Sequence, residues 1–323
     1  MKLKILISIL AMVLVAGCVV PGLEIPGVGI TPGLAGIGLE IISFSADPSP
    51  VYSRGTIRVV AEVENRGGST VDNDSALVYL TGSNIDLDDL TGRYWYGRDT
   101  DDRSEIMWFS KDMDPENVVR GTPADTERFS WTLVAPNITP GQTRQDTFIF
   151  RVYTEYSSGV NGNIWVYTDA EAEATKAAGR SLKTSSFTPV SGPVAVSINL
   201  RPNPIILYEG EDQFTFNIDV TNTAAGTIYK NNSIPYTTAT ASDLALDAES
   251  ELNWLSVDVD TDLIITECTG DQEIFGGRSM TMVCEATIPS GQPVDTFRSY
   301  LLNVIVSYGY YTEREAAVTV QGR

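Results

Sequence analysis

An alternation of apolar and polar residues, found twice in the chain and broken only by Val60 in its first copy, most constrains how the chain can fold. Residues 57–64 read Ile-Arg-Val-Val-Ala-Glu-Val-Glu, and residues 214–221 read Phe-Thr-Phe-Asn-Ile-Asp-Val-Thr. A period of two is typical of a β-strand with one buried face. Each stretch ends at an asparagine, Asn65 or Asn222, and the matching positions lie 157 residues apart. The sequence therefore predicts an internal duplication built from β-strands.

Later parts of the two halves match as well. Gly141-Gln142 and Gly291-Gln292 each precede an apolar strand, and each of these is followed by one more strand, at 164–168 and 316–320. Short strands separated by turn residues, without helical patterns between them, predict an all-β fold. We expect two tandem β-sandwich domains, at 39–190 and 191–323, because Ser, Thr, Pro and Gly cluster around 185–194. The first domain carries a long acidic and aromatic insertion.

The beginning of the chain predicts where the protein is located. Lys2 and Lys4 precede an apolar run that ends in Val-Ala-Gly-Cys at Cys18. This pattern indicates a lipoprotein signal peptide over 1–17, after which Cys18 is lipidated and becomes the first mature residue. The run is shorter than the roughly 20 residues of a membrane-spanning helix. We therefore expect an extracytoplasmic protein, anchored to membrane lipid through Cys18.

Residues 18–38 form an unusual tether, because they are rich in Gly and Pro yet mostly apolar. Exposing such side chains to water is unfavourable, and burying each contributes roughly 1.5–3 kcal/mol. Three surfaces could cover them. In order of expectation, they are the membrane surface, the sheet edge of a neighbouring copy, and the protein's own first domain.

Composition excludes several classes of function. The chain has no histidine, so a Ser-His-Asp triad and the usual zinc site are absent. Its formal net charge of −20 argues against nucleic acid as a partner. Besides Cys18 the chain contains only Cys268 and Cys284, and in an oxidising compartment we expect these two to form a disulfide. Strands on either side of a turn at 275–277 would place them opposite each other.

The first alternating strand lies in a segment that resembles a known family. Pro-Ser-Pro-Val-Tyr at 48–52, followed by the strand and Asn-Arg-Gly-Gly at 65–68, is similar to the opening of cell-adhesion-related modules of bacterial and archaeal surface proteins. The second half departs from this pattern, because its glycine, Gly226, comes later. The resemblance implies immunoglobulin-like sandwiches at the cell surface, and it brings no catalytic residues.

Acidic residues are frequent, and we expect them to be solvated. Alternate aspartates also have the spacing of a calcium loop, but the glycine and the final glutamate of an EF-hand are missing. We therefore expect no cofactor, with calcium as the alternative. The candidate ligands are Asp99, Asp101, Asp258, Asp260 and Asp262.

Aromatic residues and sequons complete the candidate sites. Consecutive aromatics on a strand point to opposite faces, so Trp95, Tyr96 and Trp108 are candidates for a partner surface. Asn73, Asn137 and Asn231 begin glycosylation sequons, and Pro140 weakens the one at Asn137.

Together these features predict a non-enzymatic, lipid-anchored surface protein that serves adhesion, envelope scaffolding or presentation of a binding surface. Its partners would be other surface proteins or its own copies. One alternative is a subunit of an extracellular filament assembled by strand addition. Another is a carbohydrate-binding or carbohydrate-processing protein that uses residues 86–114.

Overall fold

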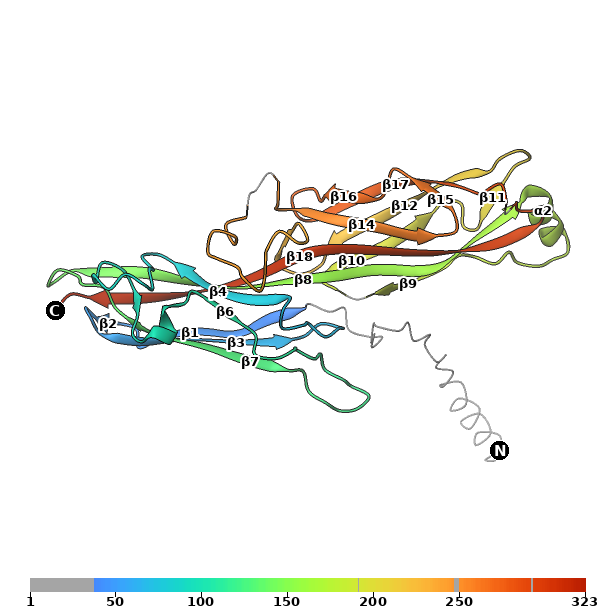
Figure 1. Ribbon diagram of the computed structural model, residues 1–323. Coiled ribbons are helices and arrows are strands. Elements are labelled where there is room, and N and C mark those ends of the chain that lie inside the picture. Colours follow the sequence, from blue (N-terminus) through green and yellow to red (C-terminus); the bar gives the residue numbers. More distant parts are fainter. Residues whose placement is uncertain (1–37, 191, 247–249, 292) are drawn as a thin grey trace, which may run out of the picture.

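The computed structural model describes residues 38–190, 192–246, 250–291 and 293–323, and it is mostly β (Figure 1). The all-β class expected from the sequence is confirmed. Within the described residues there is one α-helix, α2 (Asp169–Ala177), whose first turn is capped by the Thr168 hydroxyl. The predicted signal peptide, Cys18 and the tether up to residue 37 lie outside the described residues.

Most connections between the strands are short, but those from β4 to β5, from β6 to β7 and from β13 to β14 are long. The first half of the chain contains β1 (Leu39–Asp47), β2 (Val51–Tyr52), β3 (Thr56–Asn65), β4 (Ala76–Gly82), β5 (Tyr96–Gly97), β6 (Ile106–Trp108), β7 (Thr126–Val134) and β8 (Thr143–Thr168). The second half contains β9 (Ser186–Val190), β10 (Val194–Leu200), β11 (Ile205–Leu207), β12 (Gln213–Asn222), β13 (Thr227–Tyr229), β14 (Trp254–Thr261), β15 (Ile264–Thr266), β16 (Gly270–Glu273), β17 (Ser279–Thr287) and β18 (Phe297–Gln321). A short 3-10 helix covers Thr100–Arg103.

The described residues form three sheets. Two are four-stranded, in the orders β1-β3-β7-β5 and β10-β12-β17-β15. The third is ten-stranded and continuous, with the central order β16-β14-β18-β8-β4-β6. The two alternating stretches seen in the sequence are β3 and β12, and both are central strands of the four-stranded sheets.

Two very long strands run along the molecule (Figure 1). All 25 residues of β18 pair in one antiparallel register with the 26-residue β8, from Phe297 opposite Tyr167 to Gln321 opposite Thr143. The separate strands predicted at 164–168 and 316–320 are therefore the ends of β8 and β18. Ser157-Ser158-Gly159 resembles a turn in the sequence, but here it stays extended because it pairs with residues 305–307 of β18.

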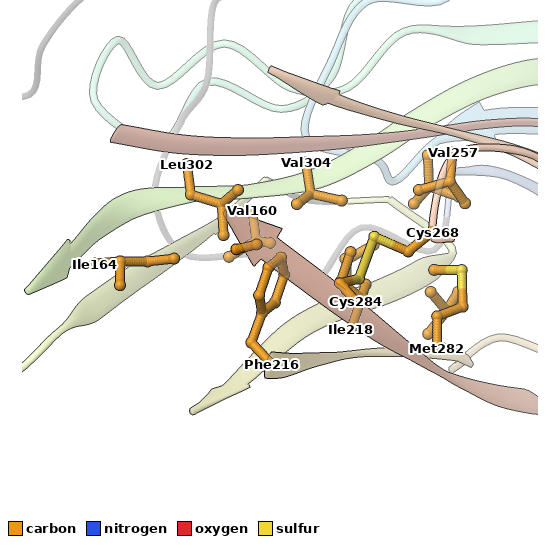
Figure 2. Close-up of a cluster of buried hydrophobic side chains, with 14 of the residues drawn as sticks. Val160, Ile164, Phe216, Ile218, Val257, Cys268, Met282, Cys284, Leu302 and Val304 are labelled. Atoms are coloured by element: carbon orange, nitrogen blue, oxygen red, sulfur yellow. A yellow bond between two sulfur atoms is a disulfide. The ribbon is translucent and has the colours of Figure 1, made fainter. Parts of the chain in front are cut away.

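Two hydrophobic cores lie between the sheets. The first core joins β1, β3 and β7 to β4 and to the first part of β8, and it includes Val59, Trp131 and Phe150. The second core joins β10, β12 and β17 to β14 and to the first part of β18 (Figure 2). The disulfide between Cys268 and Cys284 is present inside this second core, and both cysteines are fully buried.

The route around the disulfide differs from the expected hairpin. Residues 270–273 leave β15 and form β16, which pairs with β14 in the ten-stranded sheet. Cys268 thus lies where the chain passes between the two layers, while Cys284 lies on β17 opposite Phe216. A Cα separation of 5.3 Å between the two cysteines fits the bond.

Each long strand contributes to both cores. The end of β8 supplies Val160, Ile164 and Val166 to the second core. The end of β18 supplies Val318 and Val320 to the first core. The last strand of each half is therefore packed into the other half, so neither core is built from one continuous segment of the chain.

Other details recur in both halves. The Asn65 amide donates to the carbonyls of Ser69 and Met113, and the Asn222 amide donates to those of Gly226 and Gly277. The Leu39 N–H donates to the Tyr156 hydroxyl, as the Val194 N–H does to that of Tyr308. The prolines at 48, 50, 202 and 204 all follow cis peptide bonds.

Candidate interaction surface

A third hydrophobic cluster lies on the opposite face of the ten-stranded sheet from the two main cores, and we call it the outer cluster. The connection from β13 to β14 brings its side chains onto β4, β6 and β8 of the first half. The members are Leu77, Ile106, Tyr153, Tyr229, Ile234, Tyr236, Ala239 and Leu244. This cluster joins the halves a second time, in addition to the two long strands.

Polar groups within the outer cluster bond across the halves. The Tyr153 hydroxyl donates to the Leu244 carbonyl over 3.4 Å, and the Tyr229 hydroxyl donates to the Thr154 carbonyl over 3.2 Å. Burial raises the pKa of Tyr153 to about 12 and raises the pKa of Tyr229 and Tyr236 well above the usual value. These phenols are therefore neutral hydrogen-bonding groups at physiological pH.

At the edge of the outer cluster a cavity of about 310 Å³ opens beside Trp108. Its lining combines the indole of Trp108 with charged side chains from the 86–105 region, namely Asp86, Asp88, Arg103 and Glu105, and with Ala239 and Ala241 from the second half. Burial, followed by the nearby Asp86, raises the pKa of the Glu105 carboxyl. An aromatic face beside carboxylates and a guanidinium can bind a polar ligand through stacking and hydrogen bonds.

The three aromatic candidates have different surroundings. Trp95 is a core residue and not a surface one, because its indole N–H donates to the buried Asp146 carboxylate over 2.9 Å. Tyr96 is half-buried on the short strand β5. Trp108 is 44% exposed, and its indole N–H donates to the Tyr236 carbonyl. Trp108 is therefore the aromatic candidate that has both an open face and a fixed orientation.

The acidic candidates do not come together as a metal site. Asp99 and Asp101 are exposed at the short 3-10 helix, and Asp258, Asp260 and Asp262 are exposed on or just after β14. Among the described residues, no group of three or more His, Cys, Asp or Glu side chains is arranged to hold a metal ion.

The three sequons lie at the surface of the described chain. Asn73 and Asn137 are exposed, and Asn231 is half-buried. The turns that carry Asn73 and Asn231 approach the same residue, since the Glu155 N–H donates to Ser75 and the Glu155 carboxylate accepts from the Asn232 N–H. The two sequons therefore both lie near Glu155, in the middle of β8.

The sequence pointed to residues 86–114 and Trp108, which line much of the cavity, but not to the outer cluster or to Ala239 and Ala241 from the second half. One signal was available, because Val152 and Tyr153 are consecutive apolar residues in a strand, which requires burial on both faces. The residues that cover Tyr153 lie in an irregular connection at 230–246, and alternation does not report where such a connection packs.

Within the part of the chain that the structure describes, no helix is long and apolar enough to cross a membrane. Comparison with protein-family models and with curated protein sequences finds no match.

Proposed function

We propose that this protein is a non-enzymatic, lipid-anchored component of the cell surface whose body is a rigid rod made of two interlocked immunoglobulin-like sandwiches. The observation that carries the proposal is the continuous pairing of β8 with β18 through both cores. At about 3.3 Å per residue, 25 paired residues extend over about 80 Å. A body of this kind suits adhesion, envelope scaffolding or presentation of a binding surface.

The order of the strands supports the immunoglobulin-like assignment. In that fold, strands A, B, E and D form one sheet, and C, F and G form the other. In the first half, β1, β3, β7 and β5 take the places of A, B, E and D, and β4, β8 and β18 take those of C, F and G. In the second half, β10, β12, β17 and β15 face β14, β18 and β8 in the same way. Strand G is thus exchanged between the two sandwiches.

The proposed anchor is tested by changing Cys18. Cys18→Ser should move the protein from the membrane fraction to the soluble fraction or stop its maturation, because the thiol would be the point of lipid attachment. Intact mass of the wild-type protein should show a lipidated Cys18 at the mature N-terminus. A mature chain with a free Cys18 thiol, or one that keeps Met1, would contradict the anchor.

The rod is tested with the purified, unlipidated chain by small-angle X-ray scattering. We expect one elongated particle of monomer mass whose longest dimension is at least the length of the two long strands. A particle that behaves as two bodies joined by a hinge would contradict the rod. Filaments seen by electron microscopy at the same concentration would favour the alternative, a filament subunit assembled by strand addition.

A second candidate function, carbohydrate binding, is favoured by the cavity beside Trp108. The exposed indole, the carboxylates of Asp86 and Asp88 and the Arg103 guanidinium line one concave site. Binding of defined oligosaccharides, measured by calorimetry, should be lost in Trp108→Ala and retained in Tyr94→Ala. Tyr94 is a suitable control because it is 37% exposed and lies outside the cavity lining. Equal affinity in both variants would exclude this cavity as the binding site.

A further inference from the structure

One edge of β18 has a gap in its strand pairing. On the side away from β8, β18 pairs with β14 at 302–307, with β13 at 309–311 and with β2 at 320–321. No described strand pairs with 312–319 on this side. The Thr319 N–H bonds to the Ser49 hydroxyl there, over 3.2 Å. Since backbone groups alternate between the two edges of a strand, residues 313, 315 and 317 direct their N–H and C=O groups into the gap.

The equivalent edge of β8 is covered. The two edges can be matched through the short parallel strands that pair with them. Strand β2 pairs with β18, with Val51 opposite Val320, and β11 pairs with β8 in the same way, with Ile205 opposite Val166. Aligning Val320 with Val166 places residues 313–317 of β18 on residues 159–163 of β8. Strand β9 covers that stretch, with Val190 opposite Gly159 and Ser186 opposite Asn163.

The first two residues of β8 that pair with β9 are buried, whereas the matching residues of β18 are exposed. Val160 is 2% exposed and Gly159 is buried beneath β9. At the matching positions of β18, Glu313 and Arg314 are exposed. The first half therefore lacks, among its described residues, the strand that β9 supplies to the second half.

The chain contains a segment that matches β9. Residues 187–189 of β9 read Phe-Thr-Pro, and residues 30–32 read Ile-Thr-Pro. These triplets lie 157 residues apart, which is the separation between β3 and β12. The next strands, β1 and β10, also begin at equivalent positions. Leu39 begins β1 opposite Asn65, and Val194 begins β10 opposite Asn222.

The chain between residues 30–32 and β1 is long enough for these residues to lie beside β18 as β9 lies beside β8. Three residues, 191–193, join β9 to β10, and five residues, 34–38, join Gly33 to β1. The described chain begins at Gly38, and the Leu39 N–H bonds to Tyr156 over 2.5 Å. Tyr156 lies on β8 opposite Tyr308 of β18, a few residues from the gap.

We propose that residues 29–33 pair with the free edge of β18 in the same chain, antiparallel, with Gly33 opposite Glu313 and Gly29 opposite Ala317. Pro32 then lies opposite Arg314, as Pro189 lies opposite Val160 in β9. An edge strand accepts proline at a position whose nitrogen faces away from its partner. Added here, the segment closes an open edge and buries part of its own apolar surface.

This inference goes beyond the proposed function and does not depend on lipidation. If Cys18 carries the lipid, however, only residues 19–28 remain as a free tether. Ten residues span at most about 35 Å. The first sandwich would then be held close to the membrane, with its long axis constrained by a short connection.

Cysteine cross-linking tests the pairing in the full chain carrying Cys18→Ser. The test pair is Thr31→Cys with Glu315→Cys, which the proposal places directly opposite each other. The matched positive control is Thr188→Cys with Asn161→Cys, since these residues are opposite in β9 and β8. The negative control is Thr31→Cys with Asp260→Cys, on the exposed face of β14. The Cys268–Cys284 disulfide is present in every variant.

On mild oxidation, the test pair should form a cross-link at monomer mass with a yield close to that of the positive control. Peptide mapping should join residue 31 to residue 315. A cross-link found at dimer mass would overturn the proposal and assign the segment to a neighbouring copy. Absence of the cross-link, while the positive control forms, would also overturn it. The positive control shows that the oxidation conditions join cysteines on paired strands, and the melting temperature of each variant shows whether it has folded, so a failed fold is not mistaken for a negative result.

Discussion

At the scale of single residues, the buried carboxylate of Asp146 holds the irregular segment at 84–95 in place. Asp146 is 1% exposed and accepts hydrogen bonds from the Trp95 indole, the Asn84 amide and the Arg144 guanidinium, over 2.8–2.9 Å. It thereby ties the irregular 84–95 segment to β8. The acidic and aromatic insertion is thus partly internal, which explains why Trp95 does not serve as a surface residue.

Replacing Asp146 by Ala should lower the free energy of unfolding by about 1–3 kcal/mol, because the Trp95 N–H is left buried without an acceptor. Urea unfolding measures the change. Asp101→Ala, at an exposed carboxylate, is the control and should change stability by less than about 0.5 kcal/mol. A loss below about 1 kcal/mol for Asp146→Ala would mean that the segment is not held through this residue.

The paired asparagines give a second prediction at this scale. Asn65 is fully buried and satisfies two carbonyls, whereas Asn222 makes the equivalent bonds while half-buried. Asn65→Ala should destabilise the protein by about 1–3 kcal/mol, and Asn222→Ala by less, because water reaches the second site more easily. Thermal unfolding of the two variants side by side measures the difference. A larger destabilisation by Asn222→Ala than by Asn65→Ala would show that burial of the asparagine does not determine the loss of stability.

Glu105 predicts a pH dependence. Burial and Asp86 raise its pKa, so folding favours the protonated carboxyl. The protonated Glu105 carboxyl therefore contributes to stability at pH values below its pKa in the unfolded chain. This contribution is lost as the pH rises through the pKa of Glu105 in the folded protein. Glu105→Gln should therefore raise the melting temperature at pH 7, with a gain that disappears near pH 4. Glu209→Gln, at an exposed site, should show no such difference, and a pH-independent effect of Glu105→Gln would contradict the prediction.

At the scale of elements, local patterns predicted some strands well and others poorly. Strand β3 ends at Asn65, where the alternation ended in the sequence, because a central strand with one buried face must alternate. The length of β8 could not be predicted in this way. A segment such as Ser157-Ser158-Gly159 has turn propensity, and only pairing with a distant strand, β18, keeps it extended.

The glycines of the two repeats show the same limit. A Cβ at Gly67 would lie 2.9 Å from the Asn65 side chain and 3.3 Å from Gly38, whereas a Cβ at Gly226 would meet Tyr310 and Tyr311. Both positions need glycine for a close approach, but the approaching chains differ. The later position of Gly226 in the second half is thus a consequence of tertiary packing, and the shared strand pattern does not encode it.

At the scale of the whole molecule, the exchange of the final strands makes the two halves dependent on each other. Each core contains side chains from both long strands, and the outer cluster adds contacts between 230–246 and the first half. Two independent sandwiches joined by a linker would unfold separately. Here, loss of the second core removes the packing of the end of β8 and of the start of β18, and both strands continue into the first core.

We therefore expect a single cooperative unfolding transition that a change in either core displaces as a whole. Ile218→Ala, at a fully buried position of β12, should cost about 2–5 kcal/mol, and hydrogen exchange should increase in peptides of both halves, including β3 and β7. Val283→Thr is the matched control on the adjacent strand β17, because Val283 is 60% exposed. Two separate transitions, with exchange in β3 and β7 unchanged by Ile218→Ala, would show that the shared strands do not couple the halves energetically.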